Sequence, residues 1–212
     1  MPHPIELEVR GELHTADKDR VRANLLEQGF VKKDETHRTM LMSFGMIGRI
    51  PEDEDYAKQN QQPQETDIRC RITNGQAEVV VKLGGVHAHN RREISTPVSP
   101  EVLGQFARVI GSLNMLHKVG SRTTENFVKD AITASIVSSK SGLAYLELEK
   151  ISDETHAEQD KQELIALAQS LQVDLWHDRE AFIKFCTRLT NQDDWRFYGT
   201  EEDVKRFIEE TM

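Results

Sequence analysis

The feature that most constrains the fold is a set of short segments in which apolar and charged residues alternate. From Ile5 to Arg10 the apolar residues share one face and the charged residues share the other. Such alternation is typical of β-strands with one face in an apolar core. Comparable segments lie at 68–72, 77–83, 91–96, 116–128, 131–137 and 143–151. The chain is therefore predicted to form a mostly antiparallel sheet.

Turn and helix signals fit between these segments. Asn74-Gly75 joins two of them and predicts a hairpin. Ser99-Pro100-Glu101 predicts the start of a helix, in which Val102, Phe106, Ile110 and Leu113 share one face. Further helices are predicted near 15–29, 164–171, 182–189 and 204–208. Helices packed around an antiparallel sheet define the α+β class.

Length and composition limit the classes of function. A chain of 212 residues is predicted to form one domain. Its formal net charge of −9 argues against a nucleic-acid partner, because such binding depends on excess Lys and Arg. No apolar run approaches the roughly 20 residues of a membrane span, so we expect no membrane partner and a cytoplasmic location. Cys70 and Cys186 are far apart in the sequence and are predicted to be free thiols.

The charged faces of the predicted strands carry the functional argument. Five segments place two or more charges on one side: Glu6/Glu8/Arg10, Arg69/Arg71, Arg91/Glu93, Lys118/Arg122 and Glu147/Glu149. Any single pair is compatible with a solvated sheet surface. Glutamate pairs on adjacent strands would repel, and a divalent cation such as Mg²⁺ or Mn²⁺ would relieve that repulsion. Arginine and lysine pairs suit phosphate oxygens. A polyanion with a bound metal satisfies both patterns.

The ordered set of motifs resembles a known family. Glu6-x-Glu8-x-Arg10, Arg69-x-Arg71, Lys82, Arg91-x-Glu93, a strand with Lys118 and Arg122, and Glu147-x-Glu149 occur in an order similar to that of the CYTH domain. That family, the triphosphate tunnel metalloenzymes, includes class IV adenylyl cyclases, thiamine triphosphatases and inorganic triphosphatases. The resemblance implies a single domain over 1–212, with a core at about 5–190 and a C-terminal helical extension at about 191–212. It implies a closed, eight-stranded antiparallel β tunnel with a polar interior and helices outside.

The resemblance also implies roles for individual residues. The implied metal ligands, for Mg²⁺ or Mn²⁺, are Glu6, Glu8, Glu147 and Glu149. The implied ligands of the triphosphate are Arg10, Arg69, Arg71, Lys82, Arg91, Lys118 and Arg122. The implied catalytic residues are Glu8, Glu147 and Lys82.

The chain departs from the family pattern in three places. Arg10 stands where the family usually has lysine, and its guanidinium cannot readily give up a proton. Gly120 precedes Arg122 by two residues, so Lys118, two residues further back, is the substitute for the usual lysine. An aspartate that many members carry before the last acidic pair is absent, and Ala134 and Ser135 lie in that vicinity. Triphosphate binding is therefore better supported than any one reaction.

Three functions follow from this pattern. The first is metal-dependent hydrolysis of inorganic triphosphate or of a nucleoside or thiamine triphosphate. The second is cyclisation of ATP to cyclic AMP, as in class IV adenylyl cyclases, which the Phe182-x-x-Phe185 pattern resembles. The third is a noncatalytic module that binds a polyphosphate or nucleotide. In each case the partner is a small molecule that contains a triphosphate, and a homodimer is compatible with the sequence.

Other conspicuous residues have simpler interpretations. His87-x-His89 could ligate a metal, but a solvated loop is the preferred interpretation because no third ligand is nearby in the sequence. Trp176 could bind a base by stacking, but packing against the final helices is the preferred interpretation. The acidic run from Glu52 to Asp55 is expected to be solvated.

Overall fold

The computed structural model describes residues 5–44, 66–83, 92–113, 115–153 and 155–209. The chain divides into two compact units: unit 1 comprises Met1–Arg38 and Ser121–Asp194, and unit 2 comprises Thr39–Gly120 and Trp195–Met212. Arg91, the two histidines of the His87-x-His89 motif and the acidic run at 52–55 lie outside the described residues. The single domain predicted over 1–212 stays a prediction. Within the described ranges, no helix is long and apolar enough to cross a membrane.

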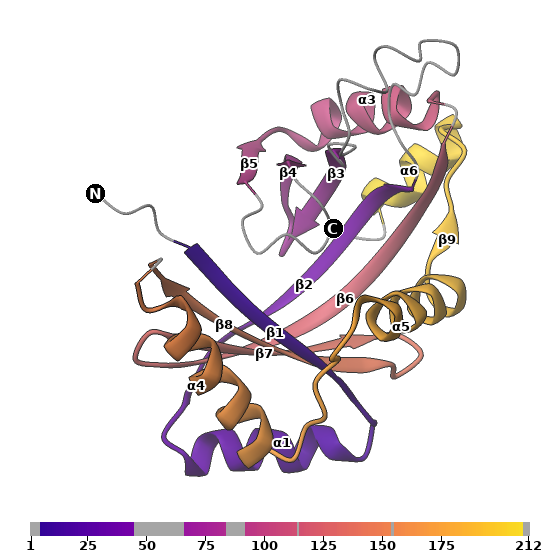
Figure 1. Cartoon of the computed structure of the whole chain (residues 1–212). Coiled ribbons are helices and arrows are strands. Elements are labelled where there is room, and N and C mark those ends of the chain that lie inside the picture. Colours follow the sequence, from indigo (N-terminus) through magenta and orange to yellow (C-terminus); the bar gives the residue numbers. More distant parts are fainter. Residues whose placement is uncertain (1–4, 45–65, 84–91, 114, 154, 210–212) are drawn as a thin grey trace. The chain divides into compact units, whose positions relative to one another are not determined.

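Unit 1 is built on antiparallel strands (Figure 1). The strand β1 (Ile5–Leu13) pairs with β8 (Ala144–Ser152), β8 with β7 (Ile132–Ser139), and β7 with β6 (Leu116–Lys129). Next to β6 in the strand order is β2 (Val31–Phe44), and both β2 and β6 continue into unit 2. The helices of unit 1 are α1 (Asp17–Glu27), α4 (Ala157–Ser170) and α5 (Arg179–Gln192).

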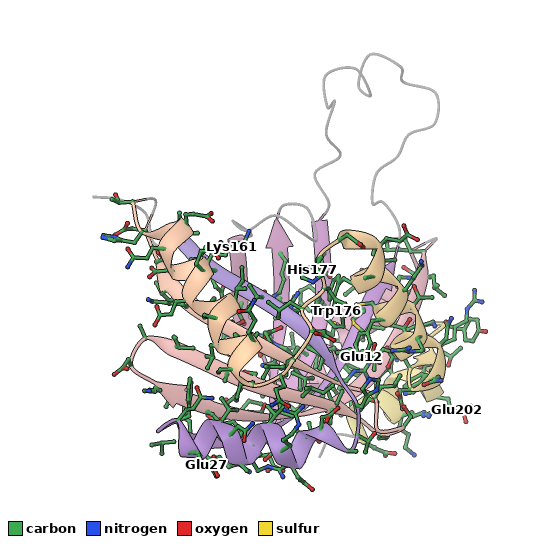
Figure 2. The ribbon with its side chains drawn as sticks, turned by 60° about the horizontal axis from the view of Figure 1, so that its bottom comes forward. Glu12, Glu27, Lys161, Trp176, His177 and Glu202 are labelled. Atoms are coloured by element: carbon green, nitrogen blue, oxygen red, sulfur yellow. The ribbon has the colours of Figure 1, made fainter. Side chains whose placement is uncertain are left out.

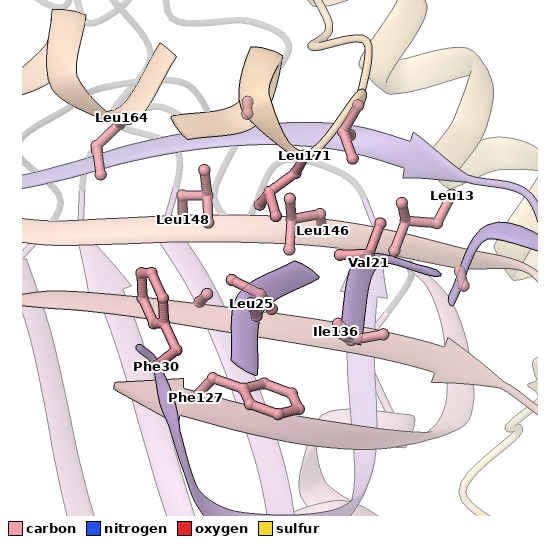
Figure 3. Close-up of a cluster of buried hydrophobic side chains, with 14 of the residues drawn as sticks. Leu13, Val21, Leu25, Phe30, Phe127, Ile136, Leu146, Leu148, Leu164 and Leu171 are labelled. Atoms are coloured by element: carbon pink, nitrogen blue, oxygen red, sulfur yellow. The ribbon is translucent and has the colours of Figure 1, made fainter. Parts of the chain in front are cut away.

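Helices α1 and α4 cover the apolar face of this sheet (Figures 1 and 3). Leu25 of α1 and Leu164 of α4 are fully buried, and they belong to one core with Leu146 and Leu148 of β8. Full burial of such a side chain contributes about 1.5–3 kcal/mol. Because successive side chains of a strand point to opposite faces, a buried Leu146 and Leu148 direct Glu147 away from this core. The apolar core thus fixes which face of β8 is polar.

Unit 2 contains a second group of strands. The strands β3 (Thr66–Thr73) and β4 (Gln76–Leu83) form the predicted hairpin, with Asn74 at φ 48° and Gly75 at φ 80°. Positive φ at both central residues is the geometry that an Asn-Gly turn favours. β4 also pairs with β5 (Arg92–Pro97). The helix α3 (Pro100–Gly111) begins as predicted, because the Ser99 side chain accepts a hydrogen bond from the Val102 N–H at 3.2 Å.

The end of the chain completes the core of unit 2. The strand β9 (Trp195–Arg196) pairs with β6, and α6 (Glu201–Glu209) packs against α3. Phe197 and Phe207 are buried in the same core as Leu103 and Ala107 of α3. From Trp195 on, the described part of the segment predicted as a C-terminal extension contributes side chains to this core.

The buried side of α3 differs from the apolar face read from the sequence. The structure buries Leu103, Ala107 and Ile110, whereas Val102 and Phe106 are exposed. Both sets have helical spacing, so the sequence offers two apolar stripes on one helix. The stripe that includes small Ala107 lies against β3, β4 and α6. A small side chain permits closer approach of the helix to its neighbours.

The closed eight-stranded tunnel predicted from the resemblance is wrong. Over the described residues, the sheet has nine strands in the order β1-β8-β7-β6-β2-β3-β4-β5, with β9 paired to β6. β1 and β5 stand at the two ends of this order, so no ladder between them closes the sheet. β5 spans six residues and ends at Pro97, which lacks an N–H for a further ladder bond. The α+β class itself agrees with the structure.

The core role of α6 can be tested with two phenylalanine variants. Phe207→Ala should lower the free energy of unfolding by about 3–5 kcal/mol, because it leaves a cavity where a fully buried ring was packed. Phe106→Ala, on a helix but 45% exposed, should change it by less than about 1 kcal/mol. Urea unfolding followed by circular dichroism measures both, and equal losses in the two variants would contradict the assigned core.

Candidate functional site

Three glutamates meet on the polar face of the β1–β8 pair. The register places Glu8 directly across from Glu149, and Arg10 directly across from Glu147. Residues opposite each other in an antiparallel pair lie on the same side of the sheet. Glu8, Glu147 and Glu149 each offer a carboxylate oxygen, and these oxygens lie within 4.8 Å of one another. We call these three residues the carboxylate cluster.

Arg10 lies within the carboxylate cluster. Its Nε donates a hydrogen bond to Glu147 Oε2 at 2.5 Å and forms an ion pair with Glu8. Burial acts to lower the pKa of Arg10, but the charges of Glu147 and Glu8 outweigh burial and raise it. The guanidinium therefore stays charged, and it is a fixed positive group between two of the carboxylates.

The pKa values of the carboxylate cluster reflect the close approach of three carboxyl groups. Burial, followed by the charge of Glu147, raises the pKa of Glu8 to about 9. Burial is the largest cause that raises the pKa of Glu149 to about 8, and the negative charge of Glu147 is the second. A hydrogen bond with Glu147 and the negative charge of Glu6 raise this pKa further. Burial also acts to raise the pKa of Glu147, but Arg10 and hydrogen bonds from its two neighbours outweigh burial and lower it. Proton binding at Glu8 and Glu149 thus offsets part of the repulsion that the charge of Arg10 leaves.

The carboxylate cluster fits a hard divalent cation. Carboxylate oxygens are the ligands that Mg²⁺ and Mn²⁺ prefer. Glu8 Oε1 is buried and, in the described part of the chain, accepts no hydrogen bond, although Arg10 is its ion-pair partner. A cation that took the place of the guanidinium would give this oxygen the bond that it lacks. Glu6, the fourth predicted ligand, lies on the same face of β1 but is exposed and outside the group of three.

The position near which the family carries an aspartate is occupied by a hydroxyl. Ser135 of β7 lies directly across from Glu147 and is buried, whereas Ala134 belongs to the apolar core. The Ser135 hydroxyl donates to Asn126 Oδ1 at 2.7 Å, and Asn126 Nδ2 donates to Asp34 Oδ1 at 2.6 Å. β7 therefore presents a neutral group beside the carboxylate cluster.

Four aromatic rings pack beside Arg10. Tyr145, Trp176, Phe182 and Phe185 lie with ring centroids 4.9–6.2 Å apart in four contacts. The Arg10 guanidinium carbon is 5.4 Å from the centre of the Phe182 ring. This confirms the predicted packing of Trp176, while the contact with Arg10 was not predicted, because no local pattern joins β1 to α5.

Backbone contacts fix the segment that carries Trp176. Trp176 lies between α4 and α5, beside the part of β1 that carries Glu12 (Figure 2). Its N–H donates to the Arg10 carbonyl at 2.9 Å. Gly11 allows this approach, because a Cβ there would collide with the Asp174 carbonyl. A glycine immediately after the Glu-x-Glu-x-Arg motif was the available sequence signal for such a contact.

Arg122, a predicted triphosphate ligand in unit 1, forms a buried ion pair. Its Nη2 lies 2.7 Å from Asp194 Oδ1, and the two side chains are 8% and 0% exposed. Its Nη1 also donates to the Ser121 carbonyl at 2.9 Å. The structure thus shows a stabilising partner for Arg122, and its role toward phosphate stays a prediction.

The other described basic residues of the predicted site lie in unit 2. Arg69 Nε donates to both carboxylate oxygens of Asp67 at 3.0 Å, and Arg71 Nε donates to Glu78 Oε1 at 2.6 Å. Lys82 lies directly across from Asp67 on the same face of the β3–β4 pair. Lys118 of β6 lies directly across from Arg196 of β9. The structure brings Arg10 to the carboxylate cluster, and binding of triphosphate by the other residues stays a prediction.

Comparison with known proteins identifies the fold. Searches against protein-family models and curated proteins found no match. Among solved structures, the PH1012 protein of Pyrococcus horikoshii OT3 has a TM-score of 0.59 at 14% identity, covering 80% of this chain and 92% of that one. A predicted adenylate cyclase from Vibrio parahaemolyticus has a TM-score of 0.60 at 14% identity, covering 86% and 98%. The PH1819 protein of Pyrococcus horikoshii OT3 reaches 0.58 at 15%, covering 86% and 99%.

These likenesses confirm the resemblance inferred from the motifs at the level of the fold. One of the three structures belongs to a protein named as a predicted adenylate cyclase. At identities of 14–15% the likeness concerns the arrangement of the chain alone.

Because the pKa of Glu8 is raised, replacing its carboxyl group by a neutral group is predicted to stabilise the folded protein. The folded-state pKa of about 9 lies above the ordinary value of 4.5. Stability that comes from the protonated carboxyl is fully present below about pH 4.5 and is lost as the pH rises through about 9. In metal-free buffer, Glu8→Gln should therefore be more stable than the parent by about 1–3 kcal/mol at pH 8, with a much smaller difference at pH 5.

Urea unfolding with a chelator at both pH values measures this difference. The matched control is Glu12→Gln, which lies on the same face of β1 but forms an ion pair with Arg188 outside the carboxylate cluster. A Glu8→Gln variant that is less stable than the parent at pH 8 would contradict the crowded cluster.

The buried pair of Arg122 and Asp194 makes a separate prediction. Arg122→Met should lower the free energy of unfolding by about 3–5 kcal/mol, because it removes the buried guanidinium that pairs with the buried Asp194 carboxylate. The double variant Arg122→Met, Asp194→Leu should recover much of this loss. Thermal and urea unfolding measure the cycle, and a single variant as stable as the parent would exclude a structural role for Arg122.

Proposed function

We infer that this chain is a metal-dependent triphosphatase that acts on inorganic triphosphate or on a nucleoside or thiamine triphosphate. The observation that carries the proposal is the convergence of Glu8, Glu147 and Glu149, with oxygens within 4.8 Å, around a charged Arg10. The shared fold with a predicted adenylate cyclase adds support, because such a cyclase acts on a nucleoside triphosphate. The motif resemblance points to the same class of substrate.

Each residue of the site has a proposed part. Glu8, Glu147 and Glu149 would hold Mg²⁺ or Mn²⁺. Glu6, near the start of β1, would be a further ligand of the ion. A bound divalent ion would supply neutralisation of phosphate charge and polarisation of a phosphate oxygen. The guanidinium groups of the predicted arginine ligands and the ammonium group of Lys82 would bind phosphate oxygens. Hydrolysis would break a phosphoanhydride bond as the oxygen of water bonds to phosphorus, and the bridging oxygen would leave with the electron pair.

The proposed phosphate ligands differ in what they bind within the protein. Arg69 and Arg71 already donate to Asp67 and Glu78 in unit 2. Charge-assisted bonds of this kind order the planar guanidinium groups. Phosphate binding by these two arginines would thus use side chains that are already oriented, whereas Arg122 would have to give up its buried partner Asp194.

A second candidate function is cyclisation of ATP. It is favoured by the fold shared with the Vibrio parahaemolyticus protein, named as a predicted adenylate cyclase. Here a ribose hydroxyl would attack the α-phosphorus, and pyrophosphate would leave. Detection of cyclic AMP would support cyclisation, whereas orthophosphate without cyclic nucleotide would support hydrolysis.

Binding without turnover is the third alternative. Arg10 stands in place of a lysine, and its guanidinium cannot readily transfer a proton. Ser135 lies across from Glu147 on β7, and its hydroxyl is a poorer ligand for a second ion than a carboxylate would be. Tight binding of tripolyphosphate by calorimetry, with no product under Mg²⁺ or Mn²⁺, would favour this alternative.

The activity prediction rests on the carboxylate cluster. With Mg²⁺ or Mn²⁺, the purified chain should release phosphate from at least one of tripolyphosphate, ATP and thiamine triphosphate. Glu147→Gln should lower kcat/KM by about 100-fold or more, because it removes a charged group at the centre of the site. Glu12→Gln, which removes a carboxylate from the same face of β1, is the matched control and should change it by less than about threefold. Full activity of Glu147→Gln would exclude the proposed site.

A further inference from the structure

The carboxylate cluster already contains a cation that belongs to the protein. The Arg10 guanidinium is hydrogen bonded to Glu147 at 2.5 Å and ion-paired with Glu8. A metal ion bound by the whole cluster would need lone pairs of these same two carboxylates. It would also approach the guanidinium, and two cations a few ångströms apart repel each other strongly where water is scarce. Arg10 and a divalent ion therefore compete for the same ligands.

Arg10 is held in this place by more than the carboxylates. Its guanidinium lies over Phe182 at 5.4 Å from the ring centre, and Phe182 packs on Trp176 at 5.2 Å between ring centroids. The Trp176 N–H holds the Arg10 backbone carbonyl at 2.9 Å. An arginine supported on both its side chain and its backbone is expected to resist displacement.

We propose that Arg10 is a built-in competitor for the divalent ion: an ion coordinates Glu8, Glu147 and Glu149 together only after the guanidinium leaves Glu8. This inference rests on the proposed metal site. The contacts of Arg10 with Glu8 and Phe182 thus lower the affinity of the chain for metal. The displaced guanidinium, which carries forked donors, becomes available to phosphate oxygens. Metal and triphosphate should therefore strengthen each other's binding, since such coupling is reciprocal.

Unit 1 offers a matched arginine for comparison. Arg188 of α5 forms an ion pair with Glu12 of β1 and lies over Phe185 at 5.4 Å from the ring centre. It therefore shares the contact types of Arg10, a glutamate of β1 and a phenylalanine of α5. Its carboxylate partner, however, does not belong to the carboxylate cluster.

The first test measures Mn²⁺ affinity by calorimetry in phosphate-free buffer. Arg10→Gln should bind Mn²⁺ about 10- to 100-fold more tightly than the parent, because the ion no longer has to displace a guanidinium that is ion-paired with Glu8. Arg188→Gln, which removes an equal charge, should change the affinity by less than about threefold. Equal effects of the two substitutions would overturn the proposal.

A second variant keeps the charge of Arg10. Phe182→Leu removes the aromatic support and should raise Mn²⁺ affinity by about two- to fivefold, as expected from loss of one cation–π contact. Phe185→Leu, which lies under Arg188, is the control and should give no gain. If Arg10→Gln does not fold, this pair decides the question. If Arg10→Gln binds Mn²⁺ more tightly but Phe182→Leu does not, the effect comes from the charge of Arg10 alone. That result would overturn the proposal that the ion displaces the guanidinium.

A third readout follows Arg10 itself. In a Mg²⁺ titration, the nuclear magnetic resonance signal of the Arg10 Nε–H should shift as the guanidinium moves away from Glu8. A signal that is unchanged at saturating Mg²⁺ would contradict the proposal. Failure of the proposed function looks different. If neither the parent nor Arg10→Gln binds Mn²⁺, the metal site and this inference both fall. If both bind with the same affinity, the metal site stands and only the role of Arg10 is wrong.

Discussion

The crowding of Glu8, Glu147 and Glu149 around one guanidinium is the constraint on which the rest of the site depends. Three half-buried carboxylates repel one another, and Arg10 offsets only part of that charge. Burial and this repulsion raise the pKa values of Glu8 and Glu149 to about 9 and 8, so that both carboxyl groups bind protons more readily. In the proposed site, a divalent ion would replace those protons. The same repulsion would then provide a driving force for binding the ion.

The fold maintains this costly arrangement through the opposite face of the same strands. Leu7 on β1 and Leu146 and Leu148 on β8 are buried against α1 and α4, so the two strands cannot rotate to release the glutamates to water. A shift of register by one residue would place the glutamates in the apolar core. The energy of the core and the geometry of the site are therefore coupled through the β1–β8 pair. Strain that serves function is commonly supported in this way by packing elsewhere.

Much of this arrangement could be predicted from local sequence. Alternation identified β1 and β8 and placed Glu6, Glu8, Glu147 and Glu149 on polar faces, because strand periodicity is a local property. The turn at Asn74-Gly75 also contained unused information. A two-residue hairpin turn places Arg71 across from Glu78, as the register confirms.

What the sequence could not provide depends on contacts between distant residues. Alternation shows that one face of a strand is polar, but it does not show whether the terminal strands pair, so the predicted tunnel closure had no local support. The ion pair of Arg122 with Asp194 and the support of Arg10 by Phe182 join positions far apart in the chain. On α3, two apolar stripes had equal helical spacing, and only packing against β3, β4 and α6 selects the one with Ala107.

The most direct test of the account is anomalous diffraction from crystals grown with Mn²⁺. The account predicts an anomalous peak within bonding distance, roughly 2 Å, of oxygens of Glu8, Glu147 and Glu149, with the Arg10 guanidinium no longer on Glu8. A well-occupied Mn²⁺ elsewhere, with Arg10 still paired to both Glu8 and Glu147 and no peak at the carboxylate cluster, would contradict it.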